Sequence, residues 1–211
     1  MRKALQRLLE RYPDLAPCRE DIEKAHELLR NCYASGGKAL ICGNGGSAAD
    51  SEHIVGELMK GFMSKRPLPA EERTRFTELY GEEGAYLADR LQGALPAISL
   101  VSHTALMTAY ANDVAPDMVF AQQVYGYGRP GDVLVGITTS GNSANVVRAV
   151  QVAKARGLAA VGLTGRTGGK LAALCDVTIR VPYDATPDVQ ERHLPIYHTI
   201  CIMLEEDFFG K

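Results

Sequence analysis

The stretch Leu40-Ile-Cys-Gly-Asn-Gly-Gly-Ser-Ala-Ala-Asp50, continued by Ser51-Glu-His-Ile-Val-Gly-Glu57, decides the fold. It predicts a buried strand that runs into a glycine-rich turn and then into a helix. Unpaired backbone N–H groups and the helix dipole make such a helix start a site for an anion. His53 and Glu57 are four residues apart, so they share one face of the helix. A phosphate site about two turns from an imidazole and a carboxylate indicates chemistry on a phosphorylated small molecule.

Composition excludes several classes of protein. The 211 residues, 46% of them hydrophobic, predict one domain over 1–211 with a substantial core. A formal charge of -2 gives no electrostatic case for nucleic acid or an acidic membrane surface. No apolar run reaches the ~18 residues of a membrane span, and no secretory h-region follows Met1. The five cysteines form no CxxC pair, so we expect reduced thiols in a cytoplasmic protein.

Apolar strands alternate with helices along the chain. Residues 1–36 predict two amphipathic helices, an N-terminal helical extension. Strands that are apolar on both faces and separated by helices predict an α/β fold, a parallel sheet with helices on both sides. Residues 64–94 break this pattern and indicate a loop with one or two short helices, an insertion at about 68–94. The expected strands are 38–42, 97–101, 131–137, 159–163 and 177–181, and a long apolar helix covers 189–208.

A second turn, Thr138-Thr-Ser-Gly-Asn-Ser143, follows the strand at 131–137. Its four hydroxyls and the helix start behind it suit a phosphate monoester, which has several oxygens to satisfy. The alternative is an ordinary strand-to-helix turn in which Ser143 caps the helix. Both turns follow strands, and ligands of parallel sheets bind at the carboxyl ends of the strands.

The last helix carries Gln190, His193 and His198. A histidine within an apolar run needs a partner or a function. Gln190 and His198 are eight residues apart and lie on nearly one face. With His53 and Glu57 they would supply the donors of a tetrahedral zinc site. The spacing does not show that the two helices meet, and His53 with Glu57 can equally be a surface pair.

In their order along the chain, the motifs resemble those of the bacterial phosphoheptose isomerases. These are sugar isomerase (SIS) domain proteins that act on sedoheptulose 7-phosphate. The match covers nearly the whole chain except about 68–94. By itself, Asn112-Asp113 is typical of a helix C-cap and turn. The matching motifs are Cys42-Gly-Asn-Gly-Gly-Ser47, His53-x3-Glu57, Asn112-Asp113, Thr138-Thr-Ser-Gly-Asn-Ser-Ala-Asn145, Leu163-Thr-Gly-x2-Gly-Gly169 and Gln190-Glu-x-His-x4-His198.

The resemblance implies a five-stranded parallel sheet, a flavodoxin-like three-layer sandwich, in a homotetramer with active sites between subunits. It implies that Glu57 and His198 carry an aldose–ketose isomerisation through an enediol, giving D-glycero-D-manno-heptose 7-phosphate. The implied zinc ligands are His53, Glu57, Gln190 and His198. The implied substrate contacts are Asn44, Gly45, Gly46, Ser47, Glu57 and Gln190, with Asn112 and Asp113 at sugar hydroxyls and Thr138, Thr139, Ser140 and Ser143 at the phosphate.

Some positions depart from the family pattern. Ala48-Ala49 replaces the usual His-Cys, Thr138 replaces the usual serine, and Pro195 lies within the last helix, where it kinks the helix unless it falls in the first turn. Two alternatives stay open. One is a non-catalytic SIS regulator or adaptor, which lacks the acidic residue and the histidine matching Glu57 and His198. The other is an isomerase of another sugar phosphate.

Overall fold

The computed structural model describes residues 2–210. All strand pairs are parallel, and the strand order is β2-β1-β3-β4-β5. The predicted five-stranded parallel sheet is therefore confirmed. The strands are β1 (Ala39–Gly43), β2 (Ala97–Ser99), β3 (Val133–Ile137), β4 (Ala159–Thr164) and β5 (Val177–Arg180).

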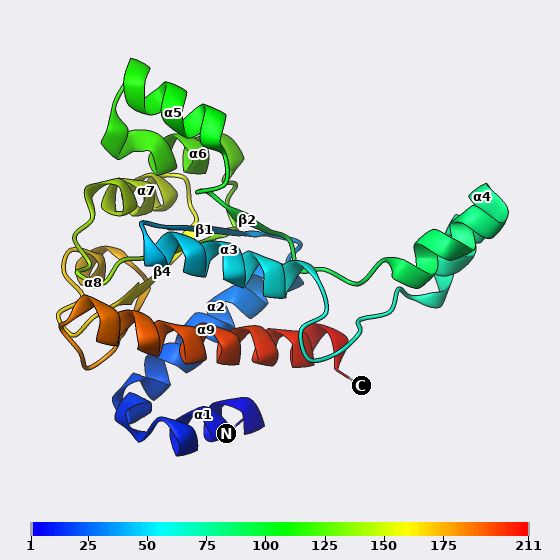
Figure 1. Cartoon of the computed structure of the whole chain (residues 1–211), viewed down its shortest axis with the longest axis horizontal. Coiled ribbons are helices and arrows are strands. Elements are labelled where there is room, and N and C mark those ends of the chain that lie inside the picture. Colours follow the sequence, from blue (N-terminus) through cyan, green and yellow to red (C-terminus); the bar gives the residue numbers. More distant parts are fainter. Residues whose placement is uncertain (1, 211) are drawn as a thin grey trace.

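Helices cover both faces of the sheet (Figure 1). Side chains alternate along each strand, so Ile41 packs with one layer while Leu40 and Cys42 pack with the other. The first layer holds α1 (Lys3–Arg11), α2 (Arg19–Ala34), α3 (Gly46–Met59) and α9 (Thr186–Phe209). The second holds α6 (Val119–Tyr127), α7 (Ala144–Ala155) and α8 (Leu171–Leu174), with α5 (Thr104–Asp113) outside them; short 3-10 turns span Pro13–Cys18 and Pro116–Met118.

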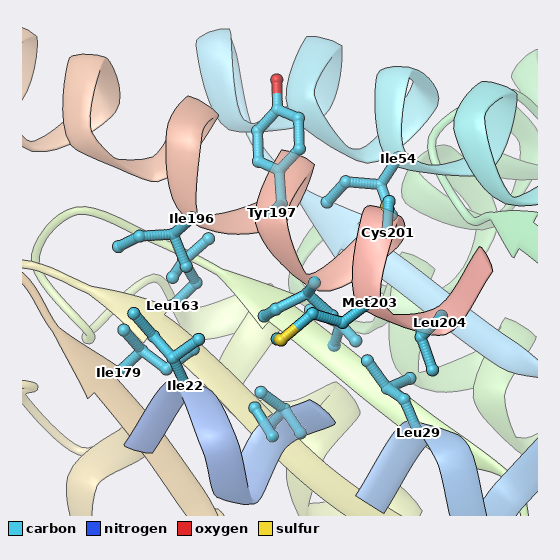
Figure 2. Packing of buried hydrophobic residues seen from close by; sticks show 14 of the residues in the cluster. Ile22, Leu29, Ile54, Leu163, Ile179, Ile196, Tyr197, Cys201, Met203 and Leu204 are labelled. Atoms are coloured by element: carbon cyan, nitrogen blue, oxygen red, sulfur yellow. The ribbon is translucent and has the colours of Figure 1, made fainter. Parts of the chain in front are cut away.

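Helix α9 forms the centre of the first layer. Ile196 and Leu204 point from it into a cluster with Leu163 and Ile179 of the sheet (Figure 2). The helix starts three residues earlier than the predicted 189–208, and it is continuous through Pro195, which lies beyond the first turn.

The segment at 64–94, predicted as a loop with one or two short helices, is mostly helical. It contains α4 (Ala70–Arg90), which bends at Gly81, where φ is +58° and ψ is -127°. The two helical arms form a hairpin that projects away from the sheet and its covering helices (Figure 1). An isolated antiparallel bridge between Pro67 and Gln92 closes its base. Among residues 2–210, no helix is both long and apolar enough to cross a membrane.

Candidate active site

Two turns lie next to each other at the carboxyl edge of the sheet. One follows β1 and the other follows β3, and these strands are paired neighbours. The amide of Asn44 donates to Asn145 Oδ1 at 2.9 Å, and the amide of Asn145 donates back to Asn44 Oδ1 at 2.9 Å. Sheets with this strand order bind ligands beside the first and third strands, where the order reverses. Both phosphate-type turns of the sequence therefore face one candidate site.

The first turn depends on its glycines. Gly45 has a φ of +57°, a conformation that other residues rarely adopt. A Cβ on Gly46 would lie 2.6 Å from Nε2 of Gln190, so glycine lets the Gln190 amide lie directly against the turn. Helix α3 begins at Gly46, and the N–H groups of Ser47 and Ala48 donate to the carbonyls of Asn44 and Gly45 in the turn, both at 3.0 Å. Ser47 is almost fully buried, with 2% of its surface exposed.

In the second turn, the residue before helix α7 does not cap that helix. Ser143 precedes α7 but makes no side-chain capping bond. Instead its Oγ lies 2.8 Å from Oγ1 of Thr138. Thr139 is half-buried and Ser140 is exposed. Gly141 has a φ of +69° and packs directly on the loop at 165–169. The turn thus presents hydroxyl groups beside the start of α7, as a phosphate requires.

Helices α3 and α9 bring together three side chains, which we call the α3–α9 cluster: His53, Glu57 and His198. Nε2 of His53 lies 3.2 Å from Oε1 of Glu57 and 3.4 Å from Nε2 of His198. Nζ of Lys60 lies 3.1 Å from the other oxygen of Glu57. Burial and the neighbouring His53 lower the pKa of His198. The structure thus shows what spacing did not, that the two helices meet at these residues.

Sequence reasoning missed two residues beside this cluster. The Tyr197 hydroxyl lies 3.0 Å from Nδ1 of His53 and donates to Oδ1 of Asp50 at 3.2 Å. Burial raises the pKa of Tyr197, and burial also raises that of Asp50 against the opposing hydrogen bond from Tyr197. Their only signal in the sequence is position, since Asp50 precedes His53 by one turn and Tyr197 adjoins His198.

Comparison with known proteins agrees with this geometry. Models of the SIS domain match residues 2–93 and 92–204. The phosphoheptose isomerase of Rhodospirillum rubrum is 40% identical over 192 residues, 91% of this chain and 88% of the relative. The chain belongs to the SIS-domain phosphoheptose isomerases. The solved phosphoheptose isomerase from Neisseria gonorrhoeae is 36% identical, with a TM-score of 0.68 over 94% of this chain and 98% of that one. The one from Francisella tularensis is 31% identical, with a TM-score of 0.73 over 89% and 86%.

Not every residue implied by the family lies at the cluster. Gln190 lies against Gly46 rather than beside His198. Among residues 2–210, no group of three or more His, Cys, Asp or Glu side chains is arranged to hold a metal ion. Nε2 of His53 nevertheless lies within 3.4 Å of a carboxylate oxygen of Glu57 and of a ring nitrogen of His198, all atoms of the kinds that bind metal ions. Such a set needs protons or a cation between its members.

Asn112 and Asp113 also lie apart. They are the last two residues of α5, and the amide of Asn112 donates to Oδ1 of Asp113 at 2.9 Å. Both side chains are solvent-facing, and none of the hydrogen bonds within 2–210 joins them to either turn or to the α3–α9 cluster. Their position at the end of α5 agrees with the interpretation of Asn112-Asp113 as a helix C-cap and turn.

Proposed function

We propose that this protein is an aldose–ketose isomerase that converts sedoheptulose 7-phosphate to D-glycero-D-manno-heptose 7-phosphate. The observation that carries the proposal is that Glu57 and His198, from different helices, both meet His53, on the helix that begins at the first phosphate-type turn. Curated relatives of about 40% identity bear the name phosphoheptose isomerase. A regulator of the same fold has no need for this acid–base pair.

The reaction moves one proton between neighbouring carbons and changes no net atoms. A base removes a proton from C1 of the ketose, and the C2 carbonyl oxygen takes up a proton, which gives an enediol. A proton then returns to C2 while the C1 hydroxyl loses its own, which leaves an aldehyde. We assign the carbon base to Glu57, whose Oε1 faces the imidazole of His53 while Lys60 holds Oε2. His198 serves the oxygens, because its lowered pKa favours a neutral ring that both accepts and returns a proton.

The two turns would hold the substrate. Thr138, Thr139, Ser140 and Ser143 suit the phosphate at the start of α7, and Asn44, Gly45, Gly46 and Ser47 suit the sugar chain.

Zinc is part of the proposal. The residues that would hold it are His53, Glu57 and His198, with Gln190 after its side chain turns away from Gly46. In a tetrahedral site with bonds of ~2.0–2.1 Å, neighbouring ligand atoms lie about 3.3 Å apart. The separations of 3.2 and 3.4 Å in the α3–α9 cluster are compatible with that spacing. A bound zinc ion would supply Lewis-acid chemistry at the substrate carbonyl or fix the reactive geometry. Its ligands overlap the proposed acid–base pair, so the two roles of Glu57 and His198 compete, because a carboxylate bound to zinc is a weaker base.

A homotetramer in the cytoplasm, with sites completed between subunits, is also proposed. Asn112 and Asp113 would act on the sugar of another subunit. Helix α5, which carries them, has no buried residue and exposes Leu106 at 39%. Surfaces of this kind are typical of protein interfaces. All five cysteines are free, as expected in a reducing compartment.

The test is turnover of sedoheptulose 7-phosphate by wild type, Glu57→Gln and His198→Ala, before and after chelation and zinc addition. Each substitution should lower kcat by about 10²–10⁴-fold while sugar phosphate still binds. Glu52→Gln is the matched control, because Glu52 is an exposed carboxylate on the same helix that bonds Ser102. Full activity in both site variants would contradict the assigned roles. Binding without turnover in wild type, with or without zinc, would favour the regulator or a different sugar phosphate.

A further inference from the structure

A hydrogen-bonded chain runs from Asp50 through Tyr197 to His53. The Tyr197 oxygen lies 3.2 Å from Oδ1 of Asp50 and 3.0 Å from Nδ1 of His53. We infer that Tyr197 and Asp50 are positioning residues that hold His53 as the Nδ1–H tautomer and aim its Nε2 lone pair at the α3–α9 cluster. The assignment rests on these contacts alone, and its consequence for catalysis rests on the proposed function.

The direction of the chain follows from counting protons. A phenol has one O–H, and Tyr197 has two hydrogen-bond partners. An ionised carboxylate only accepts, so the phenol proton goes to Asp50. The remaining contact then requires His53 to donate from Nδ1 to the phenol oxygen. Nε2 of His53 is thereby left as an acceptor, and Nε2 of His198, at 3.4 Å, can supply the proton between the two rings. Oε1 of Glu57, at 3.2 Å, favours the opposite tautomer, so the Nδ1–H tautomer requires the contacts with Tyr197 and Asp50 to outweigh this carboxylate.

The opposite direction needs a protonated Asp50. In that case Asp50 donates to Tyr197, Tyr197 donates to Nδ1, and Nε2 of His53 carries the proton. The two directions therefore predict opposite tautomers of the same ring, which makes them distinguishable by measurement.

The phenol is held rigidly enough to impose a tautomer. Tyr197 is 4% exposed, and its ring packs near Ile54 and Cys201 in the core while its hydroxyl points toward α3 (Figure 2). The His53 ring meets it edge-on, with centroids 5.5 Å apart and planes at 75°. Oδ2 of Asp50 is buried and, within residues 2–210, has no hydrogen-bond partner. An acceptor with no other partner makes the bond from Tyr197 the main constraint on this carboxylate.

The experiment is long-range ¹⁵N–¹H NMR of the imidazoles in chelator-treated, substrate-free protein at about pH 8.5, where ordinary imidazoles are neutral. A His53→Gln variant identifies the His53 signals among those of the five histidines. Wild type should show a protonated-type Nδ1 and an unprotonated-type Nε2. Asp50→Ala frees the Tyr197 proton to turn toward Nδ1, so the two shifts should exchange. In Tyr197→Phe both shifts should move toward intermediate values.

Two further variants keep the result unambiguous. Tyr183→Phe removes another hydroxyl bonded to a carboxylate, at 2.9 Å from Asp14, and should leave the His53 signals unchanged. Asp50→Asn retains an acceptor oxygen, should keep the wild-type tautomer, and replaces Asp50→Ala as the test if that variant does not fold. An Nε2–H tautomer in wild type overturns the inference, as do unchanged signals in Tyr197→Phe. Since no turnover is measured, failure here is separate from failure of the isomerase proposal.

Discussion

Two neighbouring parts of the chain are held in very different ways. Helices α3 and α9 are joined by Arg66, whose side chain is fully buried and whose φ is +45°. It donates to Oε1 of Glu205 at 2.7 Å, to the Leu58 carbonyl at 2.7 Å and to the Glu57 carbonyl at 2.9 Å. The hairpin of α4, which begins only a few residues later, buries Gly84 and Ala88 alone.

The two regions differ in burial, since buried polar contacts hold α3 and α9 together while the hairpin is mostly exposed. Arg66 binds carbonyls at the end of α3 that have no partner within the helix. Glu205 follows His198 by two turns on α9, so the pair sets the register of the two helices that carry the α3–α9 cluster. Burial raises the pKa of Glu205, but hydrogen bonds from Phe62 and Arg66 outweigh it and lower the pKa. In the hairpin, by contrast, Leu79 and Tyr80 are more than half exposed.

Glu205→Ala should lower the free energy of unfolding more than any other change considered. It leaves Arg66 buried without its carboxylate, which typically costs about 3–5 kcal/mol. Urea unfolding measures the loss. The matched control is Asp117→Ala, which removes the partner of Arg148 in an exposed ion pair and should cost less than about 1 kcal/mol. Similar losses in both variants would mean that the Arg66 pair does not fix the helices.

His193 provides the next test, again on α9 but turned toward the interior. It is fully buried, and within residues 2–210 neither ring nitrogen makes a well-formed hydrogen bond, although the backbone of Thr164 lies close enough to oppose the effect of burial on its pKa. Burial lowers its pKa to about 4, whereas the unfolded chain has the ordinary value of about 6.5. Between these values the unfolded state binds more protons, so stability falls as pH falls. The loss should approach roughly 3 kcal/mol from pH 6.5 to pH 4.

The measurement is the free energy of unfolding at several pH values in this range. His193→Leu should flatten the pH dependence by about that amount, because the variant has no imidazole to protonate. His103→Gln, which changes a half-exposed histidine before α5, should keep the wild-type slope. An unchanged slope in His193→Leu would contradict the assignment to His193.

The sequence predicted those features that depend on local pattern. Apolar runs such as 133–137 predicted the strands of the sheet. The turns after β1 and β3 were predicted together with the helices that follow them. Contacts between distant segments were not predictable, because the meeting of His53 with His198 depends on how α3 and α9 pack. The contact between Tyr197 and His53 and the burial of Arg66 likewise depend on how distant segments pack. One or two short helices were predicted in the insertion, but its charged residues gave no sign that two helical arms would pack on each other.

Deletion of the hairpin should have the smallest effect on stability. Replacing residues 70–90 by Gly-Gly keeps the bridge between Pro67 and Gln92 and the bond from the Gly93 N–H to the Arg66 carbonyl at 2.8 Å. The main polar contacts of α4 are internal, since Arg73 bonds the Ala88 carbonyl across the two arms. We therefore expect the free energy of unfolding to change by less than about 1 kcal/mol, with a small gain from the shorter loop.

The deletion also separates the roles open to the hairpin. A loss of 3 kcal/mol or more would show that it belongs to the same cooperative unit as α3 and α9. With stability retained, sedimentation that reveals a smaller assembly assigns the hairpin to a subunit contact, because Leu79, Tyr80 and Tyr86 then lie between copies of the chain. An unchanged assembly with an altered preference among sugar phosphates assigns the hairpin to substrate selection. In that case its exposed apolar residues contact the substrate and contribute little to stability.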